Sequence, residues 1–346
     1  MNMIAHVTEF GELGRQARVA RGLGSPFVAD VLEAGQRQLR WAPRTAGFFA
    51  EWPDNPSSAA LAMRFNAALH ALARRNRPAA LGALYRGEHR DFDGAIRTAL
   101  ADNDDFVLGW MRDTPQTNEV GRAAAIGSAL MVVRARFGLP FELFELGSSC
   151  GLNLNLARYR YDLGGIAAGE ARSPVLVAPE WRGELPHVAP IDVVSARGVD
   201  LHPLDPSDEQ TRERLFAYVW ADQPHRSERL AQALELALRY PPRIDRANAV
   251  SWLAERLAEP QAEGVCRTVF HSMVLQYLCD RDREVVKAKI RNAGARATAE
   301  RPFAWIGFEW TPTRSEVRLT LTTWPDGESR VLALCHPYGN WVDWRG

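Results

Sequence analysis

The segment from Phe141 to Asn153 carries residue types whose spacing suggests chemistry. A short apolar run reaches Glu145 and is followed by small residues in the order Gly147-x-Ser149-x-Gly151. A strand, a glycine-rich loop and a helix start in this order can hold an anionic or nucleotide ligand against backbone N–H groups. The same letters match Gly-x-Ser-x-Gly, the turn that presents a nucleophilic serine in a hydrolase. The segment therefore predicts either a ligand-binding loop or a hydrolase that uses Ser149.

Polar residues also follow the later apolar runs, where they would stand at strand ends. An imidazole at such a place can take a proton from a hydroxyl, an amine or an acid. Each histidine also has an ordinary structural use, as a buried or turn residue bonded to the backbone. The candidates are Asp200, Asn248, His271, Ser272, His336 and Tyr338, with His336 and His271 as the candidate bases.

The elements that must position these residues fall into two parts. Up to residue 140 apolar residues recur at helical spacing, and no strand pattern precedes Phe141. Thr114-Pro115 is typical of a helix start, and that helix should run to Arg136. After Phe141 strands alternate with helices, which predicts a doubly wound sheet with helices on both faces. The expected strands are 141–146, 193–200, 267–272, 303–309, 317–324 and 330–335, and the expected helices lie near 151–158, 208–220, 225–239, 251–257 and 281–293.

Two short connections predict which side chains meet. The helix that starts near Pro115 enters strand 141–146 through a short link, so its N-terminus should lie at the carboxyl edge of the sheet. About six residues join Trp310 to Val317, too few for a parallel crossover. Strand 317–324 should therefore run antiparallel and the next strand should return, which delivers His336 to the same edge. The side chains expected to form a substrate pocket there are Gln116, Asn118, Glu119, Arg122, Ser272 and Tyr338.

The order of elements favours cofactor binding over hydrolysis. A hydrolase elbow usually follows earlier strands, one of whose loops supplies an oxyanion N–H group, whereas here only helices precede it. The run acidic-x-Gly-x-Ser-x-Gly and a later acid for the ribose resemble S-adenosylmethionine (SAM)-dependent methyltransferases over about 141–310, and a helical cap before the first strand is an arrangement that also occurs in them. Asp200 lies 53 residues after Gly147 (200 − 147), so a β-rich insertion at about 160–190 must account for the length. By this resemblance the cofactor residues are Glu145, Gly147, Ser149, Gly151, Asn153, Asp200 for the ribose and Asn248 for the adenine.

This resemblance implies an α/β fold: a doubly wound SAM-methyltransferase-like sheet with a helical N-terminal cap and a C-terminal antiparallel hairpin. The cap would span 1–140 and the Rossmann-like domain 141–346. The implied reaction is methyl transfer to a small molecule by in-line attack on the sulfonium methyl, with the protein mainly positioning the reactants. Two other classes stay open: a serine hydrolase with Ser149 as nucleophile, and a non-catalytic ligand-binding protein on the same fold.

A set of stretches spread over nearly the whole chain resembles an uncharacterised, largely bacterial family, domain of unknown function 2332 (DUF2332). The set is specific as a whole, although the family name implies no activity. The stretches that carry the resemblance are 115–122, 145–153, 158–161, 197–205, 218–223, 271–272, 276–277 and 336–341.

Composition excludes several other classes. The formal net charge is zero, so no whole-protein field draws in nucleic acid or an anionic membrane. No run approaches the ~20 apolar residues of a membrane span, and residues 1–10 lack the pattern of a secretion signal. The four cysteines include no Cys-x-x-Cys pair, so we expect no metal site, and scattered thiols fit a reducing cytoplasm. The oligomeric state is not indicated.

Overall fold

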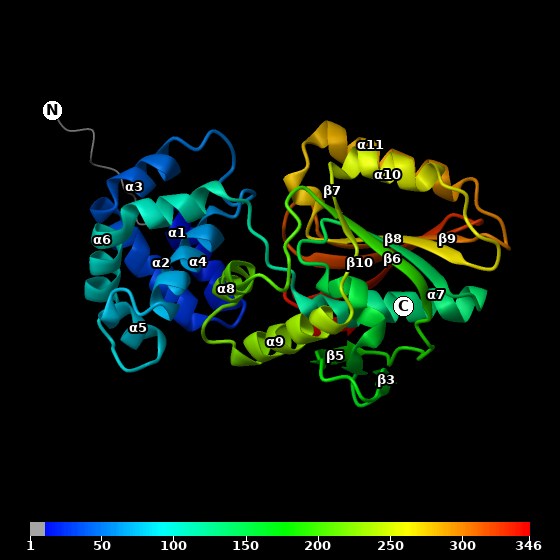
Figure 1. Ribbon diagram of the computed structural model, residues 1–346, viewed down its shortest axis with the longest axis horizontal. Helices are drawn as coiled ribbons and strands as arrows, with labels where there is room; N and C mark the ends of the chain where they lie inside the picture. Colours follow the sequence, from blue (N-terminus) through cyan, green and yellow to red (C-terminus); the bar gives the residue numbers. More distant parts are fainter. Residues whose placement is uncertain (1–10) are drawn as a thin grey trace. The chain divides into compact units, whose positions relative to one another are not determined.

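The structure is a computed structural model that describes residues 11–346 (Figure 1). The segment that bears on the predicted absence of a secretion signal, residues 1–10, lies outside this part. The chain divides into two compact units, which are described separately. Residues up to Thr117 and Glu209–Ser227 form the first unit, and Asn118–Asp208 with Glu228–Gly346 form the second.

The first unit is built from helices. Within residues 11–140 no strand occurs, as the helical spacing predicts. Helix α4 is its centre, because nearly all of its side chains are buried and its alanines allow neighbouring helices to approach. Ala67 and Ala71 of α4 pack against Ala217 and Tyr218, which assigns the later segment to this unit. The elements are α1 (Glu12–Gly22), α2 (Pro26–Gln38), η1 (Leu39–Trp41), α3 (Pro43–Ala50), α4 (Leu61–Arg74), α5 (Ala79–Tyr85), α6 (Phe92–Arg112) and α8 (Glu209–Tyr218).

The second unit is organised around a nine-stranded, mostly parallel sheet in the order β5-β12-β11-β10-β9-β8-β1-β6-β7. The strands β7, β6, β1, β8 and β9 run parallel to one another, and the order reverses between β1 and β8. Its strands are β1 (Phe141–Leu146), β5 (Glu180–Gly183), β6 (Val193–Asp200), β7 (Ile244–Arg246), β8 (Cys266–Ser272), β9 (Phe303–Trp310), β10 (Val317–Trp324), β11 (Glu328–Cys335) and β12 (Trp341–Trp344).

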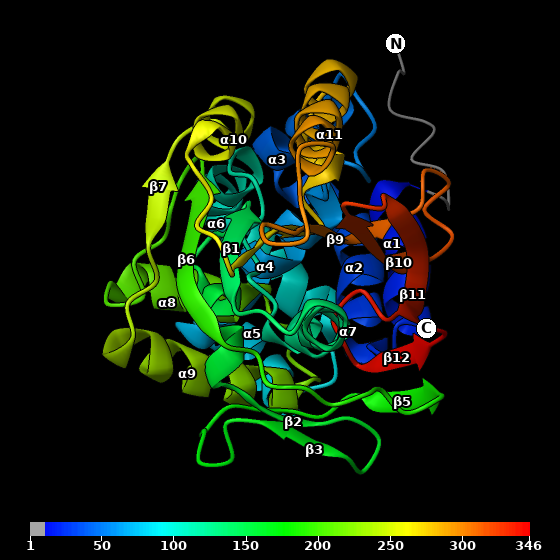
Figure 2. The ribbon, with the colours of Figure 1, turned by 90° about the vertical axis from the view of Figure 1, so that its right-hand side faces the viewer.

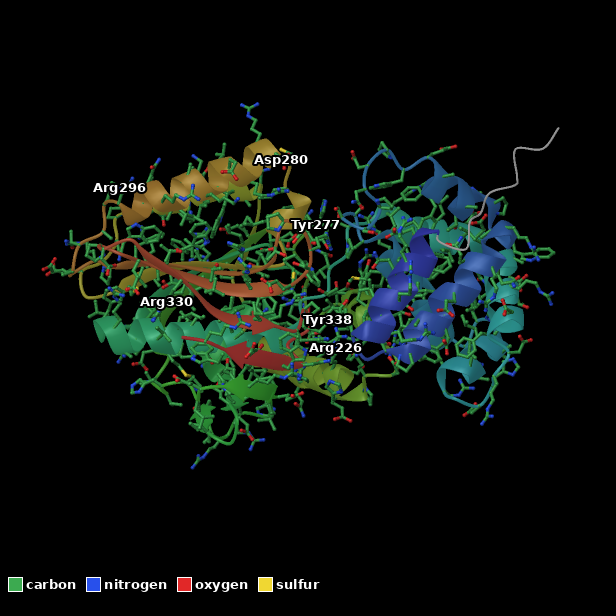
Figure 3. The ribbon with its side chains drawn as sticks, turned by 180° about the vertical axis from the view of Figure 1, so that it is seen from behind. Arg226, Tyr277, Asp280, Arg296, Arg330 and Tyr338 are labelled. Atoms are coloured by element: carbon green, nitrogen blue, oxygen red, sulfur yellow. The ribbon has the colours of Figure 1, made fainter. Side chains whose placement is uncertain are left out.

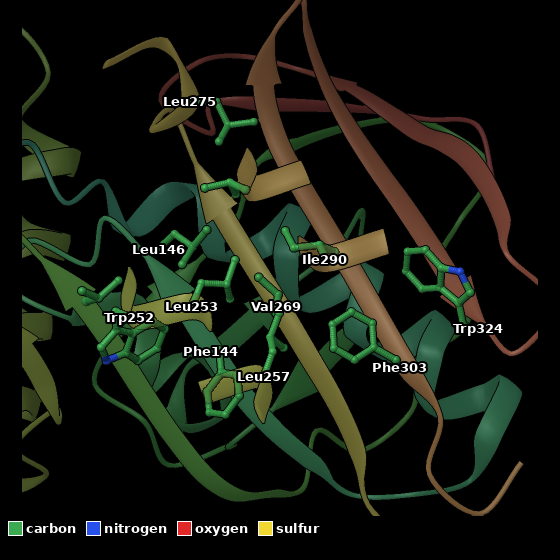
Figure 4. Packing of buried hydrophobic residues seen from close by; sticks show 12 residues of the cluster. Phe144, Leu146, Trp252, Leu253, Leu257, Val269, Leu275, Ile290, Phe303 and Trp324 are labelled. Carbon is green, nitrogen blue, oxygen red and sulfur yellow. The ribbon is translucent and has the colours of Figure 1, made fainter. Parts of the chain in front are cut away.

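Helices cover both faces of this sheet (Figure 2). Phe144 and Leu146 of β1 point to the face covered by α10 and α11, where they join an aromatic-rich core with Trp252 and Phe303 (Figure 4). Because side chains alternate along a strand, Glu145 points to the opposite face. The remaining elements of the unit are η2 (Val120–Arg122), α7 (Ala123–Phe137), η3 (Leu152–Arg158), α9 (Pro224–Arg239, in this unit from Glu228), α10 (Ala249–Ala258), η4 (Leu275–Tyr277) and α11 (Asp280–Gly294).

The C-terminal hairpin has the predicted directions. Strand β10 is antiparallel to both β9 and β11, and Cys335 pairs with Val317, which pairs with Trp310. The end of β11 therefore lies level with the carboxyl end of β9. Figure 3 shows Tyr338 beyond this end of β11 and Arg330 towards the other. The short link after β9 thus delivers His336 to the edge where the parallel strands end.

Two local predictions need correction, and one strand was not predicted. Residues 114–119 are not helical, so the predicted start at Thr114-Pro115 is wrong. The helical path begins at η2 because Asn118 has a φ of 36° and the Glu119 side chain accepts a hydrogen bond from Gly121 N. The segment after the glycine loop is a 3-10 helix, η3, and strand β12 is absent from the sequence-based interpretation.

The predicted β-rich insertion consists of two parts. A small sheet joins β2 (Arg160–Asp162), β3 (Ala167–Gly169) and β4 (Leu176–Val177), and β5 then pairs with β12 at the edge of the large sheet. These strands fill the chain between the glycine loop and β6.

The second unit begins at Asn118, before the boundary expected at 140, because α7 contacts β9, β10 and β11. Across residues 11–346, none of the helices combines the length and apolar character that crossing a bilayer requires.

Candidate functional site

The loop after β1 has the backbone that its glycines predict. Gly147, Ser149 and Gly151 all have positive φ angles, of 69°, 54° and 69°. A Cβ atom at Gly147 would lie 2.5 Å from Val274 Cγ2, and one at Gly151 would lie 2.6 Å from Pro242 Cβ. Both glycines are therefore required by the backbone conformation and by close packing against the protein's own side chains.

The N–H groups of this loop are largely engaged within the protein. Gly147 N and Ser148 N both donate to Val199 O, at 2.9 and 3.0 Å, and Gly151 N donates to Ser148 O at 2.7 Å. Ser149 N donates to Asp200 Oδ2 at 2.8 Å, and Leu152 N to Asn118 Oδ1 at 2.9 Å. Within the described chain, most of the loop N–H groups expected to bind an anionic ligand are thus already bonded, and a phosphate would find few of them free.

Asp200 joins the ends of two neighbouring strands. Besides accepting from Ser149 N, its second oxygen accepts from His202 N at 2.9 Å. The carboxylate thereby fixes the positive-φ residue of the β1 loop to the end of β6. Each carboxylate oxygen has two lone pairs, so Asp200 keeps the capacity to accept further hydrogen bonds from a ligand.

Three buried polar atoms on and beside the loop lack hydrogen-bond partners among the described residues. They are Glu145 Oε2, Ser149 Oγ and Asn153 Oδ1, on side chains that are at most 6% exposed. Buried polar groups are normally paired, and an unpaired one costs about 1–3 kcal/mol. A ligand or ordered water that hydrogen-bonds these atoms would relieve that cost, so the cluster indicates a binding position.

Glu145 is an unusual member of this cluster because burial raises the pKa of its carboxyl group well above the ordinary value of 4.5. The Ser148 side chain and the charge of Arg122 oppose this rise, whereas Asp200 adds to it. The raised pKa favours the neutral acid, which is a hydrogen-bond donor as well as an acceptor. Glu145 could therefore donate a hydrogen bond to a ligand as well as accept one.

The segment before α7 reaches the sheet edge through Asn118, Glu119 and Arg122. Asn118 binds the glycine loop, as described, and Glu119 forms a buried ion pair with Arg229, with Nη2 and Oε1 3.2 Å apart. Arg122 donates from Nε to Pro337 O at 2.9 Å and from Nη1 to Ser272 O at 3.2 Å. The structure thus brings the polar residues before α7 to the loops that follow β8 and β11.

His271 is held between two side chains of β9. Trp305 Nε1 donates to His271 Nε2 at 2.9 Å, and Nδ1 lies 2.7 Å from Glu309 Oε1. An indole N–H can only donate, so Nε2 is the acceptor and Nδ1 carries the proton. Glu309 Oε1 also accepts from Val274 N at 3.0 Å. The lone pair that a base would need is occupied, so the geometry favours a structural role for His271.

Replacing His271 with phenylalanine should therefore destabilise the second unit. The change leaves the Trp305 indole N–H without its acceptor, and a buried unpaired donor costs about 1–3 kcal/mol. Urea denaturation followed by circular dichroism measures the loss. The matched control is His187→Phe, an exposed histidine of the same unit, which should change little. Equal stability of wild type and His271→Phe would contradict the assignment.

His336 lies in a turn that packs on η2. Its Nδ1 accepts from Tyr338 N at 3.2 Å, and its ring lies between those of Tyr338 and Trp341, at centroid distances of 5.7 and 6.1 Å. A backbone N–H is a donor, so a neutral imidazole carries its proton on Nε2. This arrangement fits a turn histidine that is bonded to the backbone better than it fits a catalytic base.

The other predicted residues divide by position. Asn248 follows β7 at the same sheet edge and caps α10, its Oδ1 accepting from Val250 N at 2.8 Å. Gln116 belongs to the first unit.

Sequence reasoning missed Glu309, Trp305 and Arg229. Glu309 could have been found as an acid at the carboxyl end of a predicted strand. Among the described residues no group of three or more His, Cys, Asp and Glu side chains is arranged to hold a metal ion.

Comparisons with known proteins place the chain in a family. No curated protein and no solved structure matches it. One family model matches residues 11–344, and its description is "Uncharacterized protein conserved in bacteria (DUF2332)". The match covers nearly the whole chain and agrees with the resemblance carried by the stretches above. The chain therefore belongs to the DUF2332 family.

Proposed function

We propose that this protein binds SAM at the carboxyl ends of β1, β6 and β7 and transfers its methyl group to a small molecule. The observation that carries the proposal is the junction of the glycine loop with Asp200 beside the point where the strand order reverses. Ligands of open α/β sheets bind in this position. The parallel order β7-β6-β1-β8-β9 supports a Rossmann-like interpretation of the sheet.

The residues present fit such a cofactor better than they fit a phosphate ligand. The engaged loop N–H groups disfavour a dianion, whereas separate acceptors and donors suit a nucleoside with a zwitterionic tail. Asp200 would accept from the ribose hydroxyls, and the amide nitrogen of Asn248 would donate to the adenine. Glu145, Ser149 and Asn153 would supply hydrogen bonds from their unpartnered atoms.

When bound, SAM would supply an electrophilic sulfonium methyl group. The chain would contribute position and a fixed set of dipoles, since both candidate histidines use their acceptor nitrogens in internal hydrogen bonds. Catalysis by orientation alone can lower a barrier substantially. A non-catalytic ligand-binding protein has the same binding site, and would bind the cofactor without turning it over.

Substitution of Asp200 by asparagine tests the cofactor assignment. The variant keeps one oxygen for Ser149 N, replaces the oxygen that accepts from His202 N with an amide nitrogen, and loses the charge that would accept from two ribose hydroxyls. We expect the affinity for S-adenosylhomocysteine (SAH) to fall by about 1–3 kcal/mol, or roughly 5- to 150-fold in Kd. Isothermal titration of folded wild type and variant, checked by circular dichroism, measures this change.

The matched control for this test is Asp205→Asn, because Asp205 is exposed and, among residues 11–346, its side chain accepts hydrogen bonds only from Ser207. It should leave SAH binding unchanged. A loss in Asp205→Asn with full affinity in Asp200→Asn would move the ribose contact to Asp205. Absence of SAH binding to the wild type would refute the proposed cofactor.

A serine hydrolase remains the second candidate because Ser149 combines a φ of 54° with glycines two positions before and after it, as the nucleophile elbow has. Against it, Ser149 Oγ bonds no described histidine, and His271 Nε2 is occupied by Trp305. A fluorophosphonate probe decides between the two: labelling that disappears in Ser149→Ala would favour hydrolysis.

A further inference from the structure

Three arginines of the second unit are buried, and they differ in their partners. Arg229 pairs with Glu119, and Arg267 pairs with Glu142 at 2.6 Å. Arg122, which is 6% exposed, has no carboxylate within ion-pair distance among residues 11–346. It is thus a buried cation whose counter-charge the described chain does not supply at close range.

The partners of Arg122 are all neutral. Its Nε and Nη1 donate to Pro337 O and to the backbone and hydroxyl oxygens of Ser272, and its guanidinium carbon lies 5.8 Å from the Phe308 ring centre. Within the described chain no acceptor is bonded to Nη2. Burial lowers the pKa of Arg122, and the more distant Glu119 opposes this effect. Buried charges are normally paired, because leaving them unpaired is costly.

The position of Arg122 is also that of a ligand-binding group. Its partners are Ser272, the last residue of β8, and Pro337, just after β11, at the carboxyl edge of the sheet, and its charge acts on Glu145 beside the glycine loop. The unpartnered Glu145 Oε2 is a second, independent sign that a polar ligand belongs here. Arg267 shows the contrast, because it lies at the other end of β8, where its carboxylate partner is part of the fold.

We propose that Arg122 binds the carboxylate of a ligand at this edge. A guanidinium suits a carboxylate because its N–H groups match the two oxygens in direction and spacing. A single carboxylate suits the site better than a phosphate, since the loop N–H groups are engaged and Asp200 is close to the loop. The carboxylate belongs to the aminoacyl end of the cofactor or to a carboxylic-acid acceptor, an assignment that rests on the proposed function.

The first experiment changes only the ligand. Isothermal titration of the wild-type protein compares SAH with its decarboxylated form, S-adenosyl-3-thiopropylamine, and with 5′-methylthioadenosine. If Arg122 binds the cofactor's carboxylate, SAH should bind at least tenfold more tightly than the decarboxylated form. Because no residue is changed, this comparison does not depend on whether a variant folds.

The second experiment changes the residue. In Arg122→Met the advantage of SAH over its decarboxylated form should disappear, while 5′-methylthioadenosine should bind as before. Arg267→Met removes a buried arginine of the same unit, at the opposite end of β8, and should keep the advantage. Arg122→Lys, which retains the charge, should recover part of it.

A third comparison covers an acceptor carboxylate. If SAH and its decarboxylated form bind wild type equally, a panel of small carboxylic acids is tested by thermal shift against the matching primary amides. Acids that stabilise wild type but not Arg122→Met, with inactive amides, support the proposal with the acceptor as source. If neither comparison shows an effect that depends on a carboxylate, the proposal is overturned. Failure of every adenosyl compound to bind wild type refutes the proposed cofactor, while the acid panel still decides the role of Arg122.

Discussion

Gly147→Val is expected to destabilise the second unit strongly, whether or not a cofactor binds. The residue has a φ of 69°, which costs a non-glycine residue about 1–3 kcal/mol and is worse for a β-branched one. Its Cβ would lie 2.5 Å from Val274 Cγ2, and overpacking of this kind costs about another 1–3 kcal/mol. Urea denaturation followed by circular dichroism should show both contributions together.

Two controls separate the contributions. Gly264→Val places the same side chain at a φ of 74° with nothing within 4 Å of its Cβ, so it reports the backbone cost alone. Gly147→Val combined with Val274→Ala removes the close contact and should recover part of the loss. If Gly147→Val were no less stable than Gly264→Val, Val274 would have to move without cost, and the close packing of the loop would not matter.

The expected loss of stability changes how a loss of ligand binding in Gly147→Val should be interpreted. A loop glycine is commonly taken to make room for a ligand, but here the nearest atoms belong to the segment that follows β8. Lost SAH affinity in Gly147→Val would therefore follow from unfolding as readily as from a blocked cofactor site. Ligand binding at this edge is better tested at Asp200 and Arg122, with the stability of each variant measured in parallel.

The sequence predicts those parts of the fold that depend on neighbouring residues. The alternation of strands and helices after Phe141 gives the positions of the main strands, and the short link after Trp310 gives the direction of the hairpin. The helix start near Pro115 is wrong because a capping side chain at Glu119, together with the positive φ of Asn118, decides where the helix begins. Such a choice between two nearby starts depends on tertiary contacts.

The candidate site shows a sharper limit. Residue types and strand ends identify the polar residues of the edge, but not their hydrogen-bond partners. The Trp305 indole that occupies His271, and the absence of a carboxylate beside Arg122 within residues 11–346, depend on which side chains face each other across strands. The raised pKa of Glu145 likewise follows from burial, and the sequence of a short apolar strand does not show which of its side chains are buried.

Glu145→Gln is expected to become more stable relative to wild type as the pH rises. Burial raises the pKa of Glu145 well above 4.5 in the folded protein, whereas the unfolded chain titrates near that value. Above about pH 4.5 the unfolded state therefore binds fewer protons than the folded state, and wild-type stability falls by about 1.4 kcal/mol per pH unit from this group. The fall ends at the folded pKa. Glutamine does not titrate, so the variant lacks this loss.

The measurement is the difference in unfolding free energy between variant and wild type from pH 5 to pH 8 in urea. The control is Glu142→Gln in the same strand, which breaks the ion pair with Arg267 and should lower stability at neutral pH. A difference that does not grow with pH in Glu145→Gln would show that Glu145 is already ionised when folded.

The same acid also links folding to the proposed ligand. If the amino group of SAH lies beside Glu145, its positive charge favours the carboxylate, and binding should release a proton near the pH at which the free protein holds it. Titration of SAH in two buffers of different ionisation enthalpy measures that proton. Wild type should release it and Glu145→Gln should not. SAH binding without proton release in wild type would place the amino group away from Glu145 and leave its neutral carboxyl group as a donor to the ligand.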